Sequence, residues 1–285
     1  MLTLTRTNEV LGALASARRI CFAAYLLHPG RVLNALADAA RNGARVTVRL
    51  DGQPYVDHGG SIARANAAAV AALRAAGADA AVFDAGTRMH MKAAVVDGVA
   101  YLDDRNFNNH GDTIVRDDSR RDIASLRAAF ANRPWPRSRT FWTNKGDALA
   151  GEARLLQSAP HTRSVDVQTE SFDASNAVCA ALQRLAVRGV RCRLIVSSQT
   201  MDAKELRALH LLQRRGVAVH TAVSDEKLAI VGDRRAWVGS SNATSTYYDA
   251  DQKDWGLRTN LPTVTRELQR RFQCNWKRSA ALRVV

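Results

Sequence analysis

The sequence has no apolar run of the roughly 18 or more residues that a membrane-spanning helix requires. Its first ten residues also lack the basic segment followed by an apolar segment that marks a secretory signal. These absences predict a globular protein with no transmembrane segment and a cytoplasmic location.

Cysteine is scarce, and the spacing of the four cysteines fits neither a zinc knuckle nor a disulfide scaffold. We therefore expect reduced, mostly buried thiols at Cys21, Cys179, Cys192 and Cys274. Five histidines also follow no metal-ligand spacing, namely His58, His110, His161, His210 and His220. The sequence predicts no metal site.

Lysine is scarce as well, since only six of the 41 basic residues are Lys and the rest are Arg. The net charge of +14 favours binding to polyanions such as nucleic acid or an anionic phospholipid surface. The alternative is that codon bias makes an Arg-rich chain basic. Two of the six lysines, Lys92 and Lys227, fall in the motifs below, where an ammonium point charge can bind phosphate.

The two halves of the chain predict the same order of elements: strand, helix, strand, helix, strand. In the first half, apolar patterning places these elements at residues 20–27, 31–42, 45–50, 62–76 and 80–83. In the second half it places them at residues 164–169, 174–188, 190–196, 203–215 and 217–221. Residues 36–46 also resemble residues 182–192, which indicates a duplication.

Alternating helices and short apolar strands predict an α/β fold with two similar α-β-α lobes and mixed sheets. We place the lobes at residues 1–131 and 148–285, joined by a linker at residues 132–147. The linker interleaves arginines with Trp135, Phe141 and Trp142. Such a segment either stacks bases beside a phosphate track or pins the two lobes together.

Each half continues into a polar motif. The first is His90-Met91-Lys92, with Asp97 five residues after Lys92, and it is followed by Asp103-Asp104-Arg105-Asn106. The second is Asp225-Glu226-Lys227, with Gly232 in the place of Asp97, and it is followed by Gly239-Ser240-Ser241-Asn242. Strand alternation puts the first and third residues of each triplet on one face, so their side chains can meet at one phosphate.

These paired motifs resemble the signature of the phospholipase D superfamily, which is His-x-Lys, four residues, Asp, about six residues and Gly-Ser-x-Asn, present twice. The resemblance covers nearly the whole chain and implies a pseudo-two-fold phospholipase D-like fold in a monomer. It also implies a metal-independent phosphodiesterase without a cofactor, in which a histidine attacks phosphorus to give a phosphohistidine intermediate.

By position in that signature, His90 would be the nucleophile and Asp225 the general acid that replaces the second histidine. Asp254 would share a proton with Asp225 and so keep it protonated. Asp112 would orient the His90 ring, with Asp117 as the fallback. The phosphate oxygens would be held by Lys92, Asn106, Lys227, Asn242 and Ser240.

Both motifs depart from the signature. In the first, Asp103 and Asp104 replace Gly-Ser, and because a carboxylate repels phosphate, Asp104 points away, pairs with an arginine or weakens binding. In the second, Asp225 replaces histidine, either as an acid that still works or as a substitution that inactivates the enzyme.

The basic composition favours a nuclease. The first alternative is a phospholipase D or phosphatidyltransferase that acts on phospholipids, and its apolar rim would come from Trp135–Trp142 or from Tyr247 and Tyr248. The second alternative is a catalytically impaired homologue that binds phosphate without turnover.

Overall fold

The computed structural model describes residues 1–54, 60–83, 86–107, 112–134, 138–160, 163–199, 201–245 and 252–283. It divides into two compact units. The first comprises Met1–Ser138 and Asp251–Trp255, and the second comprises Arg139–Ala250 and Gly256–Val285. Several residues singled out above lie outside the described residues, namely His58, His110, Trp135, His161, Tyr247 and Tyr248.

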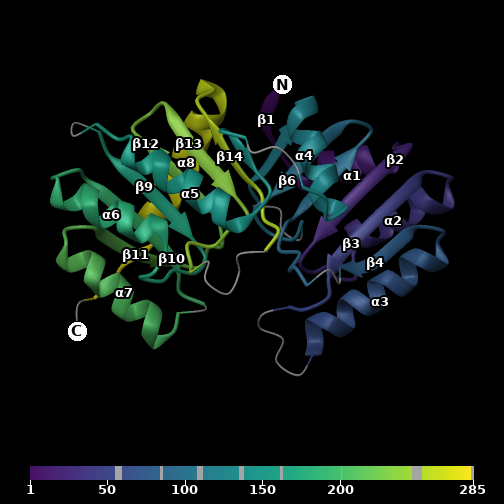
Figure 1. Ribbon diagram of the computed structural model, residues 1–285, viewed down its shortest axis with the longest axis horizontal. Coiled ribbons are helices and arrows are strands. Elements are labelled where there is room, and N and C mark those ends of the chain that lie inside the picture. The colour runs from purple at the N-terminus through teal and green to yellow at the C-terminus, as the bar shows by residue number, and fades with distance from the viewer. Residues whose placement is uncertain are drawn as a thin grey trace. The chain divides into compact units, whose positions relative to one another are not determined.

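The first unit is built on a mixed seven-stranded sheet (Figure 1). Its strands are β1 (Leu2–Thr5), β2 (Arg19–Ala24), β3 (Arg45–Asp51), β4 (Asp79–Phe83), β5 (Ala93–Val96), β6 (Val99–Asp103) and β7 (Ile114–Asp117). Its helices are α1 (Thr7–Ala15), α2 (Arg31–Arg41), α3 (Ser61–Ala75) and α4 (Arg120–Phe130). The strand order is β1-β7-β6-β5-β2-β3-β4, in which β2, β3 and β4 are parallel.

The second unit has a mixed eight-stranded sheet. Its strands are β8 (Phe141–Trp142), β9 (Val165–Thr169), β10 (Cys192–Ser197), β11 (Ala218–Ala222), β12 (Leu228–Val231), β13 (Arg235–Gly239), β14 (Gly256–Thr259) and β15 (Ala280–Ala281). Its helices are α5 (Lys145–Gln157), α6 (Ala177–Val187), α7 (Ala203–Arg214) and α8 (Pro262–Arg278). The strand order is β15-β11-β10-β9-β12-β13-β14-β8.

The two sheets share one topology. The order β7-β6-β5-β2-β3-β4 of the first unit is repeated as β14-β13-β12-β9-β10-β11 in the second. In each unit three helices cover one face of the sheet and the last helix packs on the other, α4 against β5 and β2, and α8 against β12 and β11. The predicted α/β class with two similar lobes is confirmed, and the repeat gives every position in one unit a counterpart in the other.

Most predicted elements differ from the observed ones by three residues or fewer, and hydrogen bonds explain two of the differences. The first strand ends at Ala24 because the backbone N–H groups of Leu26 and Leu27 donate to the side chains of Asn106 and Asn66 instead of to a neighbouring strand. In the second unit, Asn176 caps α6, since its side chain accepts from the Cys179 N–H at 2.8 Å.

The segment predicted as a linker contains regular structure. It includes β8, and α5 begins at Lys145. Phe141 and Trp142 are buried in the second unit, and the Trp142 ring fills the space beside Gly151, where any Cβ would lie 2.5 Å from the ring. These two aromatic side chains are therefore part of the core, and neither is exposed for base stacking or for an apolar rim.

Residues 252–255 follow the second motif in the sequence but belong to the first unit. The Lys253 backbone accepts from the His90 N–H at 2.9 Å and donates to the Arg88 carbonyl at 2.8 Å. Trp255, fully buried, donates its indole N–H to the Asp103 carbonyl. The second lobe is thus not continuous over 148–285, and this segment lies against the first motif.

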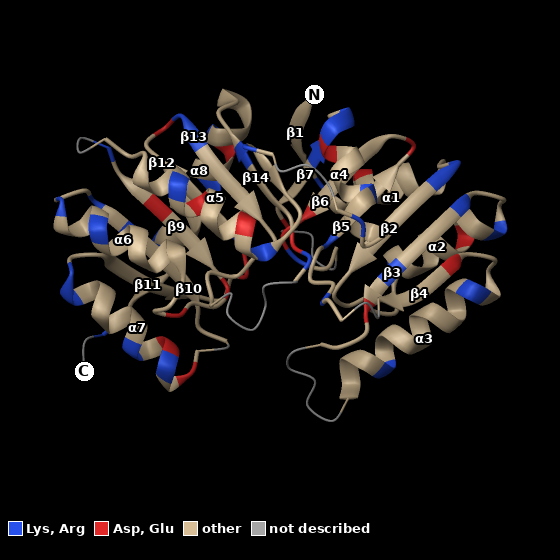
Figure 2. Ribbon diagram, in the orientation of Figure 1, with Lys and Arg blue, Asp and Glu red and all other residues tan. Residues whose placement is uncertain are grey.

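Charged residues occur along the chain in both units (Figure 2). None of the helices described is long and apolar enough to cross a membrane.

Cys179 and Cys192 are buried, Cys21 and Cys274 are partly exposed, and all four are free thiols.

Candidate active site

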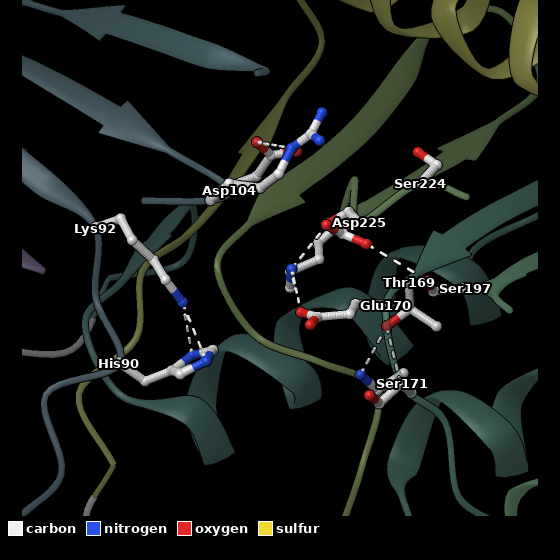
Figure 3. Close-up of polar contacts among 12 residues, drawn as sticks. His90, Lys92, Asp104, Thr169, Glu170, Ser171, Ser197, Ser224 and Asp225 are labelled. Carbon is white, nitrogen blue, oxygen red and sulfur yellow. Dashed lines mark hydrogen bonds and ion pairs between the residues drawn. The ribbon is translucent and has the colours of Figure 1, made fainter. Parts of the chain in front are cut away.

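His90 and Lys92 lie just before β5 and are both largely buried, with 9% and 2% of their surfaces exposed. The Lys92 Nζ lies 3.0 Å from the Nε2 of His90 and 3.2 Å from its Nδ1 (Figure 3). The two residues predicted on one face of the strand are therefore in direct contact. An ammonium group beside an imidazole is suited to bind the anion that the imidazole attacks.

Asp254 orients the His90 ring. Its Oδ1 lies 2.9 Å from the His90 Nδ1, and its Oδ2 accepts from the side-chain amide of Gln252. Because the Asp254 carboxylate is completely buried, this contact holds Nδ1 as the protonated nitrogen and leaves the Nε2 lone pair for chemistry. The structure thus gives Asp254 as the partner of His90, a role for which the sequence analysis predicted Asp112. The proton shared between Asp254 and Asp225 stays a prediction.

Asp112 instead lies in a buried group with the residues that replace Gly-Ser. The Arg105 Nε is 3.0 Å from the Asp112 carboxylate and 3.9 Å from that of Asp104. Asp104 also accepts from the Thr113 N–H at 3.1 Å. Of the three alternatives for Asp104, the structure supports pairing with an arginine.

Asp103, like Asp104, is completely buried. Its side chain accepts from the Phe107 N–H. Burial, reinforced by the charges of Asp112 and Asp104, raises the pKa of Asp103 well above its ordinary range. This shift favours the protonated form of Asp103, and protonation lowers the negative charge buried beside the first motif.

Two further predicted residues of the first unit have backbone partners. Asn106 accepts from the Leu26 N–H at 3.3 Å and so ties its loop to the end of β2. Asp117, the fallback partner for His90, accepts from the Ser119 N–H at 2.9 Å at the start of α4, which is a helix-capping position.

Tyr25 is a contact residue of the first motif that the sequence analysis missed. It follows β2, and its ring packs edge-on against His90 with 5.2 Å between the ring centroids. The Lys92 Nζ lies 5.7 Å from the centre of the same ring. Tyr25 therefore contacts both motif residues.

The second motif has a different set of contacts (Figure 3). Asp225 is partly exposed, and its carboxylate accepts from the Ser197 hydroxyl at 3.4 Å. Lys227 is 2% exposed, donates to the Asp225 carbonyl at 2.8 Å and forms an ion pair of 2.9 Å with Glu170. The lysine predicted to hold phosphate thus contacts a carboxylate of its own unit.

Glu170 is the counterpart of Tyr25. Ile20 pairs with Val96 in the first sheet, and Val165 pairs with Val231 in the second, so Ile20 and Val165 occupy equivalent positions. Tyr25 and Glu170 each lie five residues further on, directly after β2 and β9. The residue after the first parallel strand therefore contacts the motif lysine in both copies. Aligning the two halves of the sequence beyond their motifs would have identified both residues.

The remaining predicted residues of the second unit lie after β13. Ser240 is fully buried. The Asn242 Oδ1 is buried and has no hydrogen-bond partner in the part of the chain that the structure describes. Among all the residues that the structure describes in both units, no group of three or more His, Cys, Asp or Glu side chains has an arrangement that could hold a metal ion.

The two copies also differ in their contacts at the position of the motif aspartate. In the first unit, Asp97 accepts from the backbone N–H groups of Arg18 and Arg19, with a shortest distance of 2.8 Å. Gly232 has no side chain for this purpose, and its own N–H donates to the Ser164 carbonyl. The motif aspartate thus fixes the start of a strand in the first copy only.

Comparison with known proteins agrees with this architecture. The family described as “Cardiolipin synthase, PLD-like domain” matches residues 10–135 and 153–276. No curated protein sequence matches the chain significantly.

Solved structures similar to this chain include the following three, of which the first two have TM-scores above 0.5 and illustrate the fold. A polyphosphate kinase from Porphyromonas gingivalis has a TM-score of 0.72 at 16% identity, over 97% of this chain and 47% of that one. The phosphatidylserine synthase of Haemophilus influenzae Rd KW20 has a TM-score of 0.68 at 10% identity, over 99% of this chain and 87% of that one. Nuc from Salmonella typhimurium, a phospholipase D family member, has a TM-score of 0.45 at 18% identity, over 51% of this chain and 99% of that one.

At these identities the structural likeness concerns the fold alone, and the chain spans about half the length of the polyphosphate kinase, 47%. The family match covers most of both halves, each with its own motif. The chain therefore belongs to the phospholipase D-like domain family.

Proposed function

We propose that the chain is a phosphodiesterase that uses His90 as its nucleophile. The observation that carries this proposal is the buried His90–Asp254 contact of 2.9 Å with the Lys92 ammonium 3.0 Å from the opposite ring nitrogen. A buried carboxylate that fixes the tautomer of a histidine is a common way to prepare the other nitrogen for attack.

In the proposed reaction, the Nε2 lone pair of His90 forms a bond to phosphorus while the bond from phosphorus to the leaving oxygen breaks. Lys92 neutralises charge on the phosphoryl oxygens, with Asn106, Lys227, Asn242 and Ser240 in the same proposed role. Asp225 gives the leaving oxygen its proton. Water then attacks phosphorus, gives a proton to Asp225 and breaks the bond from phosphorus to Nε2, which releases the phosphate product and restores His90 and the protonated Asp225.

The first experiment is turnover of bis(p-nitrophenyl) phosphate in the presence of EDTA, with mass spectrometry of alkali-quenched protein. We expect EDTA-resistant hydrolysis and a phosphorylated peptide that contains His90, because a phosphoramidate survives alkali. His90→Ala should show neither. Turnover without a phosphohistidine, or turnover that persists in His90→Ala, would refute the assignment of the nucleophile.

The same experiment tests Asp225, because p-nitrophenolate is a good leaving group that departs without a proton. Asp225→Asn should therefore keep most of its activity on this substrate and lose it on a diester with an alkyl leaving group. Equal losses on both substrates would exclude Asp225 as the proton donor. If the parent chain has no turnover and Asp225→His has, the chain is an impaired homologue.

The Lys227–Glu170 ion pair leads to a separate prediction. Phosphate must compete with the Glu170 carboxylate, which is 31% exposed, for the Lys227 ammonium. We expect Glu170→Gln to lower KM and the inhibition constant of inorganic phosphate by about fivefold, as expected for removal of a competing contact worth about 1 kcal/mol. The value of kcat should change little, and an unchanged inhibition constant would show that Lys227 does not bind phosphate.

As substrate we propose nucleic acid, because a net charge of +14 attracts a phosphodiester polymer. The second candidate is a phospholipid, which is favoured by the description of the matching family as cardiolipin synthase. Cleavage of labelled single-stranded DNA or RNA, compared with release of headgroups from anionic vesicles, distinguishes the two.

A further inference from the structure

The second unit has a large groove lined with arginines, of about 1240 Å³, at the end of its sheet that is remote from the motif. The groove lies where β12 ends at Val231, four residues after Lys227, which is roughly 13 Å along a strand. Figure 2 shows the turn into β13 in blue. Six arginines line the groove, namely Arg139, Arg163, Arg234, Arg235, Arg258 and Arg266.

These guanidinium groups are poorly neutralised. Asp233 is the one carboxylate among the residues that line the groove, and it lies 3.2 Å from Arg163 and 3.7 Å from Arg234. Arg235 donates to Ser158. In the part of the chain that the structure describes, no carboxylate forms an ion pair with Arg139 or Arg258. The groove therefore has a strong positive potential.

The first unit serves as an internal comparison, because several positions of the same surface differ in charge between the two copies. In the sheets, Ala100 pairs with Asp117 and Ala236 pairs with Thr259, so the carboxylate of Asp117 has a neutral counterpart in the second copy. The next residue, Asp118, pairs with the N-terminal ammonium of Met1, and its counterpart is the neutral Asn260.

Two more differences in charge between the copies also make the second unit more positive. Asp97 corresponds to Gly232, since each donates its N–H to the equivalent carbonyl of the neighbouring strand. The turn continues with Gly98 in the first unit and with Asp233 and Arg234 in the second, which is one residue longer. The next residue is Val99 in the first unit and Arg235 in the second. Three carboxylates are thus absent from the second copy, while two guanidinium groups and one carboxylate, that of Asp233, are added. An overall excess of arginine does not explain this, because it would affect both copies.

We propose that this groove binds the phosphate backbone of a nucleic-acid strand, at a position separate from the second motif. Arginine suits this role because its planar guanidinium donates two parallel hydrogen bonds to a phosphate. A recessed channel of this volume accepts a flexible strand but not the flat surface of a bilayer. The inference goes beyond the proposed phosphodiesterase activity and does not require turnover.

The test is the binding of a fluorescent single-stranded 20-mer of DNA, measured by anisotropy in the His90→Ala background, in which the proposed nucleophile is absent. The groove variant is Arg234→Glu with Arg258→Glu. The matched control is Arg116→Glu with Arg120→Glu, which makes the same change in net charge on the first unit, where Arg116 is the counterpart of Arg258.

We expect the groove variant to bind at least tenfold more weakly and the control to bind within threefold of the parent. The slope of log K against log salt should fall by about 1.4 in the groove variant, for two lost phosphate contacts to a single strand. Asn260→Asp, which restores one carboxylate of the first copy at an exposed position, should weaken binding about threefold.

Equal weakening in the groove variant and the control would overturn the proposal, since it would show an effect of net charge alone. Retained DNA binding with a loss of binding to vesicles of anionic phospholipid would assign the groove to a membrane instead. With His90 intact, the groove variant should hydrolyse bis(p-nitrophenyl) phosphate as the parent does. That readout separates failure of this inference from failure of the proposed activity.

Discussion

Asp254→Asn is expected to lower kcat for bis(p-nitrophenyl) phosphate by about 1,000-fold to 10,000-fold, with little change in KM. The Asp254 carboxylate accepts from the His90 Nδ1 at 2.9 Å and is fully buried. An asparagine of the same shape presents either an amide N–H or a weaker acceptor to that nitrogen. The ring then no longer keeps its Nε2 lone pair available, whereas substrate binding through Lys92 is unaffected.

The matched control for this prediction is Asp112→Asn. It makes the same chemical change at a carboxylate that is also buried, but Asp112 is paired with Arg105 at 3.0 Å and not with His90. We expect kcat to stay within about fivefold of the parent. If the two variants lost activity equally, or if Asp112→Asn lost more, the assignment of Asp254 as the residue that positions His90 would be wrong.

Glu152→Gln is expected to stabilise the protein by about 3 kcal/mol at pH 7. Glu152 lies on α5 and is 2% exposed, and burial raises the pKa of its carboxyl to about 8. At pH 7 folding must therefore place a proton on a group that is ionised in the unfolded chain. Each pH unit above the ordinary pKa costs roughly 1.4 kcal/mol, and a neutral glutamine avoids this cost.

The raised pKa of Glu152 also determines how the stability of the protein changes with pH. Because the folded pKa of Glu152 is raised, the folded state binds the extra proton between about pH 4.5 and pH 8. The stability of the parent should fall as the pH rises through this range, and that of Glu152→Gln should fall less steeply. Urea unfolding of both proteins at pH 5, 6, 7 and 8 measures the difference.

The expected difference in unfolding free energy between Glu152→Gln and the parent increases with pH and is close to zero near pH 4.5. Asp38→Asn, a change at an exposed carboxylate on α2, should leave stability within about 0.5 kcal/mol at every pH. A constant gap between Glu152→Gln and the parent would mean that Glu152 is ionised in the folded protein.

The fold class and the duplication follow from local features of the amino-acid sequence. Apolar periodicity placed most strands and helices close to their observed ends, because the alternation of buried positions is a local property of each segment. Two motifs in register, each preceded by the same elements, identified the family and the residues His90, Lys92 and Lys227. These features repeat at fixed spacing, so they can be recognised without knowledge of which segments meet in space.

Only the tertiary structure decided which carboxylate contacts His90. Asp112 and Asp254 each follow the motif of their own half of the sequence, and nothing in the local pattern indicates that residues 252–255 join the first unit. The same holds for Glu170 and Lys227, which are 57 residues apart and form an ion pair where adjacent strands end. The arginine groove is likewise built from separate segments, so its charge emerges only when the sheet brings their ends together. The physical reason is that pairing between segments depends on sheet register and burial, which no single stretch of sequence encodes.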